Sequence, residues 1–306
     1  MSQNANAETA QQYKALEARF DRAAKLYDAT YGQPDEQGHG NLLLGWLRDR
    51  HLAVLRDVMP ERALLLEIGS GTGEEALILA REGYSVLGID ISPVMVRQAQ
   101  TKAAVHGLSR SATFRTLPAG RLAALDERGP FQGAYASLGT LNTEPDLAGM
   151  ARGLHALLVP GAPFVATMMS RHCLYEILHY LVRFKPGRIM RRGPDWHEAR
   201  AGTGGVDAPV KFYSPRAFAA AIAPYFTVES VQALPLWLPP VHMHDLYRER
   251  QAHFAQREGW DRRMRTWPAF RAWGDHFIMV LRQNPDAAAP EQDAAAPPDT
   301  STEEPS

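Results

Sequence analysis

The feature that most constrains this chain is the stretch LLLEIGSGTGEEA, residues 64–76. Four apolar residues surround Glu67 and run directly into three glycines at alternate positions, Gly69, Gly71 and Gly73. A helical pattern follows at once, so the stretch predicts a strand, a glycine turn and a helix. Such a turn presents backbone N–H groups and a helix N-terminus to a ligand where no Cβ blocks its approach. We therefore expect a binding site at the carboxyl end of this strand.

The next predicted strand, YSVLGID, ends in Asp90, which is placed to accept hydrogen bonds from a ribose diol. The ligand is thus predicted to be an adenosine-containing cofactor. One register of the turn, GTGEEA, also satisfies the dinucleotide fingerprint G-x-G-x-x-G/A. Three features favour S-adenosylmethionine over a dinucleotide. First, the Glu67 carboxylate suits an ammonium group and would repel a pyrophosphate. Second, Glu74 and Glu75 in the first helical turn make the helix N-terminus a poor binding site for phosphate. Third, about sixty residues precede the first strand, whereas dinucleotide-binding domains usually begin near it.

The motifs E-I-G-S-G-T-G and G-I-D-I-S together resemble those of class I S-adenosylmethionine-dependent methyltransferases of the small-molecule type. The resemblance implies an α/β fold with a Rossmann-like, doubly wound, seven-stranded sheet. This sheet is mostly parallel with an antiparallel last strand, and it carries a helical N-terminal lid and cap insertions. The resemblance also implies a shell of residues around S-adenosylmethionine: Tyr27, Glu67, Gly69, Ser70, Gly71, Gly73, Asp90, Ile91, Leu117, Ser137 and Leu138.

Two members of this shell rest on separate observations. Tyr27 belongs to the phrase F-D-R-A-A-K-L-Y-D, which resembles the pre-domain helix of quinone-biosynthesis methyltransferases, where the tyrosine lies over the cofactor. A tyrosine that simply packs on the sheet is the alternative. Leu117 stands where the family usually has an Asp nearby for the adenine amino group, but this chain reads T-L-P-A-G-R. We infer that backbone groups near Leu117 and Pro118 hold the adenine.

Catalysis of methyl transfer from a sulfonium depends on holding donor and acceptor in contact, and it requires a general base only if the acceptor is protonated. The candidates for that base are His172, Tyr213 and His39. His172 is the first choice because it directly follows the fifth predicted strand. The alternative is that it caps the next helix or points to solvent. His242-x-His244 lacks further ligands at recognisable spacing, so no metal site is predicted.

The composition is typical of a soluble globular protein, with 45% hydrophobic and 22% charged residues among 306. The formal net charge is −1, but the six acids after Arg282 stand without a Lys or Arg, which leaves the rest of the chain at about +5. A single cysteine, Cys173, excludes an intrachain disulfide, and the N-terminus has no signal-peptide pattern. These observations predict a cytoplasmic protein. The signature Asn/Asp-Pro-Pro-Tyr/Phe is missing, so nucleic acid is not an expected partner.

The predicted organisation is one methyltransferase domain over residues 13–283, with disordered ends at 1–12 and 284–306. Residues 13–60 form the helical lid, and residues 170–212 and 235–274 are insertions that cap the substrate. Inside the first insertion, 193–210 is rich in Gly and Pro and predicted to be a loop. Inside the second, 261–274 is predicted to be a basic helix with two tryptophans.

Residues 173–192 combine an apolar helical stripe with five cations that have no acid among them, Arg183, Lys185, Arg188, Arg191 and Arg192. A solvated face, a surface that contacts anionic lipid and a lid over an acidic substrate are all consistent with this pattern.

Together these features predict an S-adenosylmethionine-dependent methyltransferase that acts on a small, partly apolar or anionic molecule. An NAD-dependent oxidoreductase and a non-catalytic cofactor-binding module are the alternatives.

Overall fold

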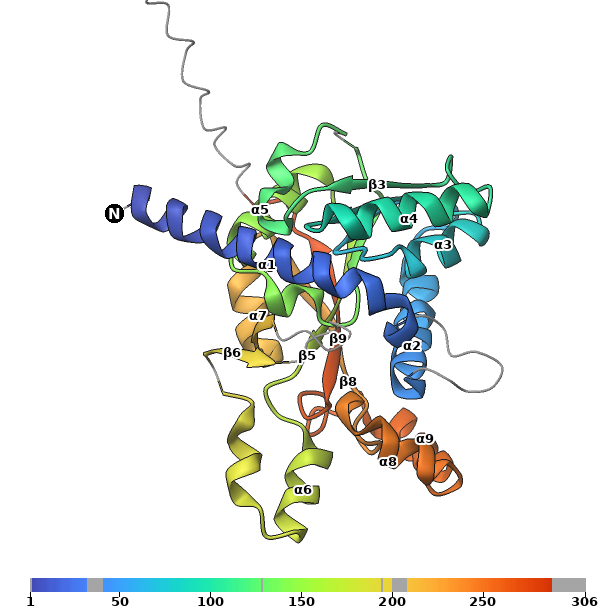
Figure 1. Ribbon diagram of the computed structural model, residues 1–306, viewed down its shortest axis with the longest axis vertical. Helices are drawn as coiled ribbons and strands as arrows, with labels where there is room; N and C mark the ends of the chain where they lie inside the picture. The colour runs from blue at the N-terminus through green and yellow to red at the C-terminus, as the bar shows by residue number, and fades with distance from the viewer. Residues whose placement is uncertain (1, 32–40, 128, 194, 200–207, 288–306) are drawn as a thin grey trace, which may run out of the picture.

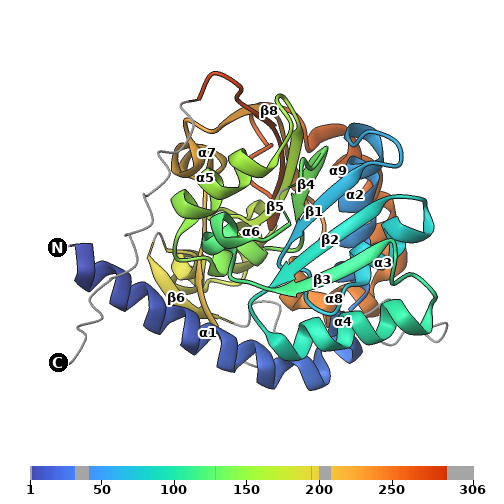
Figure 2. The ribbon, with the colours of Figure 1, turned by 90° about the horizontal axis from the view of Figure 1, so that it is seen from above.

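A seven-stranded sheet forms the centre of the protein, whose computed structural model describes residues 2–31, 41–127, 129–193, 195–199 and 208–287. The strand order is β3-β2-β1-β4-β5-β9-β8 (Figures 1 and 2). The strands are β1 (Leu64–Ile68), β2 (Ser85–Asp90), β3 (Ala112–Thr116), β4 (Gly133–Ala136), β5 (Pro163–Met169), β8 (Phe226–Leu234) and β9 (His276–Gln283).

The pairing of these strands confirms the predicted sheet. The strands β3, β2, β1, β4 and β5 pair in parallel, whereas β9 is antiparallel to both of its neighbours, β5 and β8. In the register of β1, Glu67 lies beside Gly88 on one side and Tyr135 on the other. Since parallel strands end at one edge, the carboxyl ends of β1, β2 and β4 meet where the glycine turn begins.

Helices cover both faces of the sheet, as a doubly wound fold requires (Figure 2). The longer ones are α1 (Ser2–Tyr31), α2 (Leu42–Val58), α3 (Glu74–Arg81), α4 (Pro93–Val105), α5 (Leu147–Leu157), α6 (Leu174–Val182), α7 (Pro215–Ile222) and α9 (Gln251–Met264). The shorter ones are α8 (His244–Glu249) and the 3-10 helices η1 (Ala119–Ala124), η2 (Thr140–Thr143), η3 (Pro186–Arg191) and η4 (Val241–Met243). The core on one face packs α5, α7 and η1, and the core on the other packs α2, α3 and α4. None of the helices among the described residues is long and apolar enough to cross a membrane.

Helix starts follow the capping signals of the sequence. Ser92 and Ser214 each accept a hydrogen bond from the backbone N–H three residues on, and a proline follows each as the first helical residue. Asn41 caps α2 in the same way, accepting from the N–H groups of Leu43 and Leu44.

The prediction of disorder at 1–12 is wrong for residues 2–12, which belong to α1. The segment ANAETAQQ favours a helix because most of its residues have good helix propensity. The next turns are anchored by Tyr13 and Leu16, whose side chains are buried. Residue 1 lies outside the described residues.

Both insertions differ from their predicted secondary structure. Part of the predicted loop at 193–210 is a two-stranded antiparallel pair, β6 (Trp196–Ala199) and β7 (Ala208–Lys211). It is fixed by long-range contacts, among them an ion pair from Arg19 of α1 to Glu198 and a bond from the Asn142 amide to the Lys211 carbonyl. In the second insertion the helix ends at Met264, ahead of Pro268, which removes a backbone donor, and turns follow.

A buried ion cluster secures the arm of α6 and η3 to the sheet. The Arg192 guanidinium contacts the carboxylates of Glu176 in α6 and Asp275 at the start of β9, and all three side chains are buried. Burial opposes ionisation, but Arg192 dominates and holds the pKa of Asp275 well below its ordinary value. One of the five cations of residues 173–192 is therefore structural.

The prediction of disorder from residue 284 is wrong for residues 284–287. Asn284 is attached to the domain, because its N–H and side-chain amide donate to the carbonyls of Tyr225 and Pro224. Residues 288–306 of the predicted tail lie outside the described residues.

Candidate functional site

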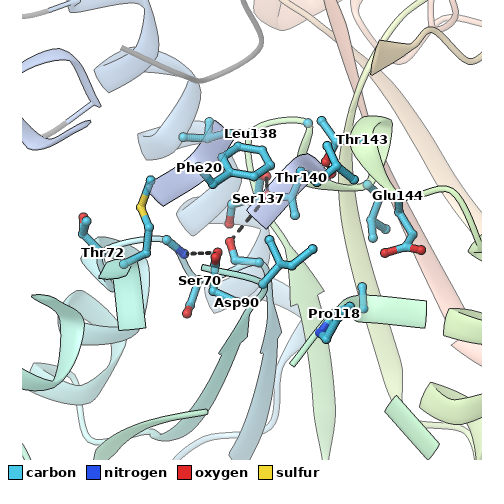
Figure 3. A pocket seen from close by; sticks show the side chains of 18 of the residues that line it. Phe20, Ser70, Thr72, Asp90, Pro118, Ser137, Leu138, Thr140, Thr143 and Glu144 are labelled. Atoms are coloured by element: carbon cyan, nitrogen blue, oxygen red, sulfur yellow. Dashed lines mark hydrogen bonds between the residues drawn. The ribbon is translucent and has the colours of Figure 1, made fainter. Parts of the chain in front are cut away.

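A cavity of about 1030 Å³, including the space at its open mouth, lies at the carboxyl ends of β1, β2 and β4 (Figure 3). Its described lining comes from α1, α2, the glycine turn and the segments after β2, β3 and β4. The lining residues are Tyr13, Leu16, Phe20, Tyr27, Arg48, Gly69, Ser70, Gly71, Thr72, Glu74, Glu75, Asp90, Ile91, Met95, Leu117, Pro118, Ala119, Ser137, Leu138, Gly139, Thr140, Leu141, Thr143 and Glu144.

The glycine turn forms the floor of the cavity, and its backbone requires glycine. Gly69 and Gly71 both have positive φ, at 73° and 51°. A Cβ on Gly69 would lie 1.9 Å from the Thr140 side chain, and one on Gly71 would reach into the space beside Tyr27. Glycine at positions 69 and 71 therefore keeps open the part of the cavity next to the turn, which a side chain at either position would fill.

Asp90 is the carboxylate at the centre of the site. Its Oδ2 accepts from the Gly71 N–H at 2.8 Å, and its Oδ1 accepts from the Ser92 N–H at 2.8 Å. Burial raises the pKa of Asp90 to about 6, even though these two N–H groups favour the charged form. Each oxygen has a second lone pair, so Asp90 holds the turn in place and can still accept hydrogen bonds from a ligand in the cavity.

One face of α1 forms a wall of the cavity. Tyr13, Leu16, Phe20 and Tyr27 recur at spacings of three, four and seven, so their side chains lie on the same side of the helix. This placement puts Tyr27 opposite Gly71, and the lid over residues 13–60 stays a prediction.

A buried pair lies at the other end of the cavity from Thr72 (Figure 3). The Tyr13 hydroxyl donates a short hydrogen bond to Glu144, which also accepts from the Asp146 N–H. Burial raises the pKa of Glu144, while the bond from Tyr13 favours its charged form. Glu144 is thus a carboxylate in the cavity wall that can accept a proton.

Glu67 does not face the cavity, contrary to its predicted role beside an ammonium group. Alternation along β1 places its side chain on the same face of the sheet as Leu65, toward α2. The side chain is 1% exposed, and burial followed by repulsion from Glu75 raises its pKa well above the ordinary value. The carboxyl group therefore lies beneath the site, not in it.

Arg48 of α2 connects this buried layer to the cavity. Its guanidinium pairs with Glu75 at 2.9 Å and also lines the cavity. Burial raises the pKa of Glu75, but the Arg48 ion pair overcomes this and leaves it below its ordinary value.

The remaining predicted shell residues fall into two groups. Those that line the cavity are Tyr27, Gly69, Ser70, Gly71, Asp90, Ile91, Leu117, Ser137 and Leu138. Gly73 does not line it: it precedes α3 in a left-handed conformation, and a Cβ there would meet Phe114 at 2.8 Å. It serves the packing of α3 and α4 on the sheet.

The predicted bases are not in the cavity. The His172 ring is exposed and packs on Trp273, and burial together with Arg171 lowers its pKa. Tyr213 is buried against Phe218, and burial raises its pKa to about 12. His39 lies outside the described residues.

The separation has a structural cause. The short helix η2 lies between the cavity and the end of β5, held there by Asn142, whose amide donates to the carbonyls of Met169 and Lys211. Residues that follow β5 therefore lie behind η2.

Several cavity residues were not predicted as site residues. Arg48, Tyr13 and Glu144 belong to segments far apart in the sequence, and no local motif marks any of them. Thr140 and Met95 were also missed, although each lies within a few residues of a predicted position.

Known proteins resemble this chain mainly in the segment that surrounds the cavity. Residues 65–161 match a protein-family model described as a methyltransferase domain. A demethylmenaquinone methyltransferase from Tropheryma whipplei is 35% identical over 88 residues, which cover 27% of this chain and 32% of the relative. The chain thus spans about a third of the length of the curated relatives it matches.

Solved structures extend the likeness to the whole fold. The CcbJ methyltransferase from Streptomyces caelestis has a TM-score of 0.54 at 18% identity and covers 87% of this chain and 98% of its own. The [4+2]-cyclase SpnF has a TM-score of 0.51 at 18% identity and covers 78% of this chain and 81% of its own. Residues 65–161 therefore match a methyltransferase domain, and the chain shares the fold of these two solved structures.

Proposed function

We propose that the protein transfers a methyl group from S-adenosylmethionine to a small, partly apolar or anionic molecule. The observation that carries this proposal is the cavity in which Asp90 and the backbone of the glycine turn meet at the carboxyl edge of the sheet. The fold by itself does not decide the reaction, since a [4+2]-cyclase shares it.

The lining fits the parts of S-adenosylmethionine. Asp90 would accept from the ribose hydroxyls, and the apolar side chains of Met95, Leu117 and Leu138 would flank the adenine. Arg48, which also pairs with Glu75, would contact the methionine carboxylate, and Glu74 in the same wall would contact the ammonium group. The bound cofactor supplies a sulfonium methyl group, and the chain's own residues bind and orient both partners.

The acceptor would bind where α1 and η2 close the cavity. Phe20 and Leu16 offer apolar contact there, and Glu144 is the carboxylate that would take a proton if the acceptor is a hydroxyl or amine. We propose Glu144 for this role in place of His172 and Tyr213, because it lines the cavity and they do not.

The same site gives less support to the two alternative functions, an NAD-dependent oxidoreductase and a non-catalytic module. In an NAD-dependent oxidoreductase a pyrophosphate would lie at the start of α3, where Glu74 and Glu75 both face the cavity. A non-catalytic module would keep the cofactor site, and only turnover separates it from an enzyme. Contact of residues 173–192 with a membrane surface is an additional proposal, supported by the exposed end of α6.

The proposed function is tested by binding and turnover. S-adenosylmethionine and S-adenosylhomocysteine should each bind in a calorimetric titration and raise the unfolding temperature, whereas NADH should do neither. With cell extract and a radiolabelled methyl donor, the protein should yield a labelled small molecule. Stabilisation by NADH alone would support the oxidoreductase, and cofactor binding without labelled product would support the module.

Binding of S-adenosylmethionine should also depend on pH through Asp90. The charged carboxylate accepts from the ribose, so affinity should fall as the pH drops through about 6, the pKa of Asp90 in the free protein. At one unit below that pKa the loss should be about tenfold. Titrations from neutral to mildly acidic pH check this. The variant Asp90→Asn should bind more weakly at neutral pH and show a flat profile, and an equal slope in both proteins would contradict the assignment.

A further inference from the structure

A second, cationic groove lies between α6 and the α8–α9 pair, away from the proposed cofactor cavity. Its volume is about 350 Å³ including its open side. Three guanidinium groups and two imidazoles converge on it, and no carboxylate is found among its described lining residues. These residues are Tyr175, His179, Arg183, Leu246, Arg250, His253, Phe254 and Arg257.

The described side-chain contacts of Arg257 and Arg183 in the groove are to rings of the groove itself. The Arg257 guanidinium lies 5.5 Å from the centre of the Phe254 ring, and that ring packs against Tyr175 of α6. Arg183 contacts His179 at 3.0 Å. Two acids of α8 and α9 have partners outside the groove: Glu258 accepts from the Tyr247 hydroxyl, and Asp245 pairs with Arg248. Such a set of converging, uncompensated guanidinium groups matches a phosphate ester.

The end of α6 beside this groove exposes large apolar side chains. Val182 is 75% exposed and Phe184 is 92% exposed, and Leu178 and Leu181 are also exposed. In Figure 1, α6 and the segment after it project from the body of the molecule. By helical spacing, Leu178 and Val182 lie on the same face of α6 as the groove residues Tyr175 and His179. The apolar tip and the cationic groove therefore form one continuous surface.

Phe184 occupies a position that normally favours glycine. Its φ is 54°, and its N–H donates to the Leu181 carbonyl while the N–H of Lys185 donates to the Tyr180 carbonyl, so it lies just past the helix in the left-handed conformation. A bulky residue is strained there, and Phe184 gains no burial within the chain to offset that strain. Arg183 and Lys185 flank Phe184 in the sequence, and Arg188 follows four residues later.

We propose that this surface docks on an anionic lipid membrane, with a lipid phosphate in the groove and the tip of Val182 and Phe184 in the apolar layer. An apolar tip beside a cationic groove matches the boundary between lipid headgroups and acyl chains. A second copy of the chain fits less well, because a two-fold interface would bring the same cations face to face. The proposal extends beyond methyl transfer and does not depend on it.

Vesicle sedimentation tests the proposal on the whole protein. Vesicles of phosphatidylcholine with phosphatidylglycerol should bind the protein, vesicles of phosphatidylcholine alone should bind it poorly, and added salt should weaken the binding. Since each basic residue near an anionic surface contributes a factor of about five, Arg250→Gln/Arg257→Gln should bind about 30-fold more weakly. The control Arg110→Gln/Arg152→Gln removes the same charge from exposed positions elsewhere, and its vesicle affinity should fall much less.

The apolar tip has its own matched pair of variants. Val182→Ser should lose about tenfold in vesicle affinity, whereas Val105→Ser, at a valine that is 77% exposed on α4, should lose little. Thermal unfolding of each variant confirms that the fold is intact, and calorimetric titration with S-adenosylhomocysteine tests the cofactor site independently.

Four outcomes would overturn the proposal. One is equal binding to both kinds of vesicle, and another is an equal loss in each variant and its control. The third is occupancy of the groove by inorganic phosphate or glycerol 3-phosphate, detected by titration, in a protein that does not bind anionic vesicles; the ligand would then be a free anion. Self-association lost with Val182→Ser, again without vesicle binding, would assign the tip to a second copy.

Discussion

Asp90→Ala should weaken the binding of S-adenosylmethionine about 100-fold. Hydrogen bonds to a charged group contribute about 1.5–3 kcal/mol each, and the carboxylate would accept from the ribose diol inside a partly dry cavity. The variant also removes the acceptor for the Gly71 and Ser92 N–H groups, so part of the loss comes from a less ordered glycine turn.

Calorimetric titration of Asp90→Ala and Asp90→Asn separates these two contributions. The asparagine carbonyl keeps one acceptor for the turn but lacks the charge, and we expect it to lose about tenfold. Thermal unfolding of the free proteins shows whether the turn has been disrupted. An affinity for Asp90→Ala within about threefold of the original would contradict the placement of the ribose at Asp90.

Arg48→Met should lower the free energy of unfolding by about 3–5 kcal/mol, because it leaves the buried Glu75 carboxylate without its cation. Arg48 is 1% exposed and pairs with Glu75, and Glu67 is buried in the same layer. For a chain of this size the loss corresponds to a fall in unfolding temperature of roughly 10 °C. Denaturant unfolding of the free protein measures it.

The double variant Arg48→Met/Glu75→Gln is the control. Removing both charges should recover much of the lost stability, since a buried neutral amide costs less than a buried unpaired carboxylate. The Glu75 ion pair should support stability fully above pH 4.5, its ordinary pKa, and that support should be lost as acid protonates Glu75 in the folded state. If the free energy of unfolding of Arg48→Met lies within about 1 kcal/mol of that of the original protein, the Arg48–Glu75 ion pair contributes little to stability.

The sequence by itself determined the elements whose signals are local. Strand, glycine turn and helix at 64–76 follow from an apolar run and from the alternate glycines after it, and the helix starts at Ser92 and Ser214 follow from capping. The sheet with its antiparallel last strand was predicted from the family resemblance of those motifs, and the strand pairing confirmed it.

Other features were decided only by tertiary structure, because they depend on partners distant in the chain. Glu67 lies under the site since the pleat of β1 directs it toward Arg48, and no local pattern reveals that neighbour. His172 follows its strand as predicted, yet η2 separates it from the cavity. The short strands β6 and β7 form where α1 and η2 hold them, although their sequence reads as a loop. The local pattern of apolar residues, glycines and caps determines the secondary structure of each segment. Which side chains meet at the carboxyl edge of the sheet depends instead on how the segments pack together.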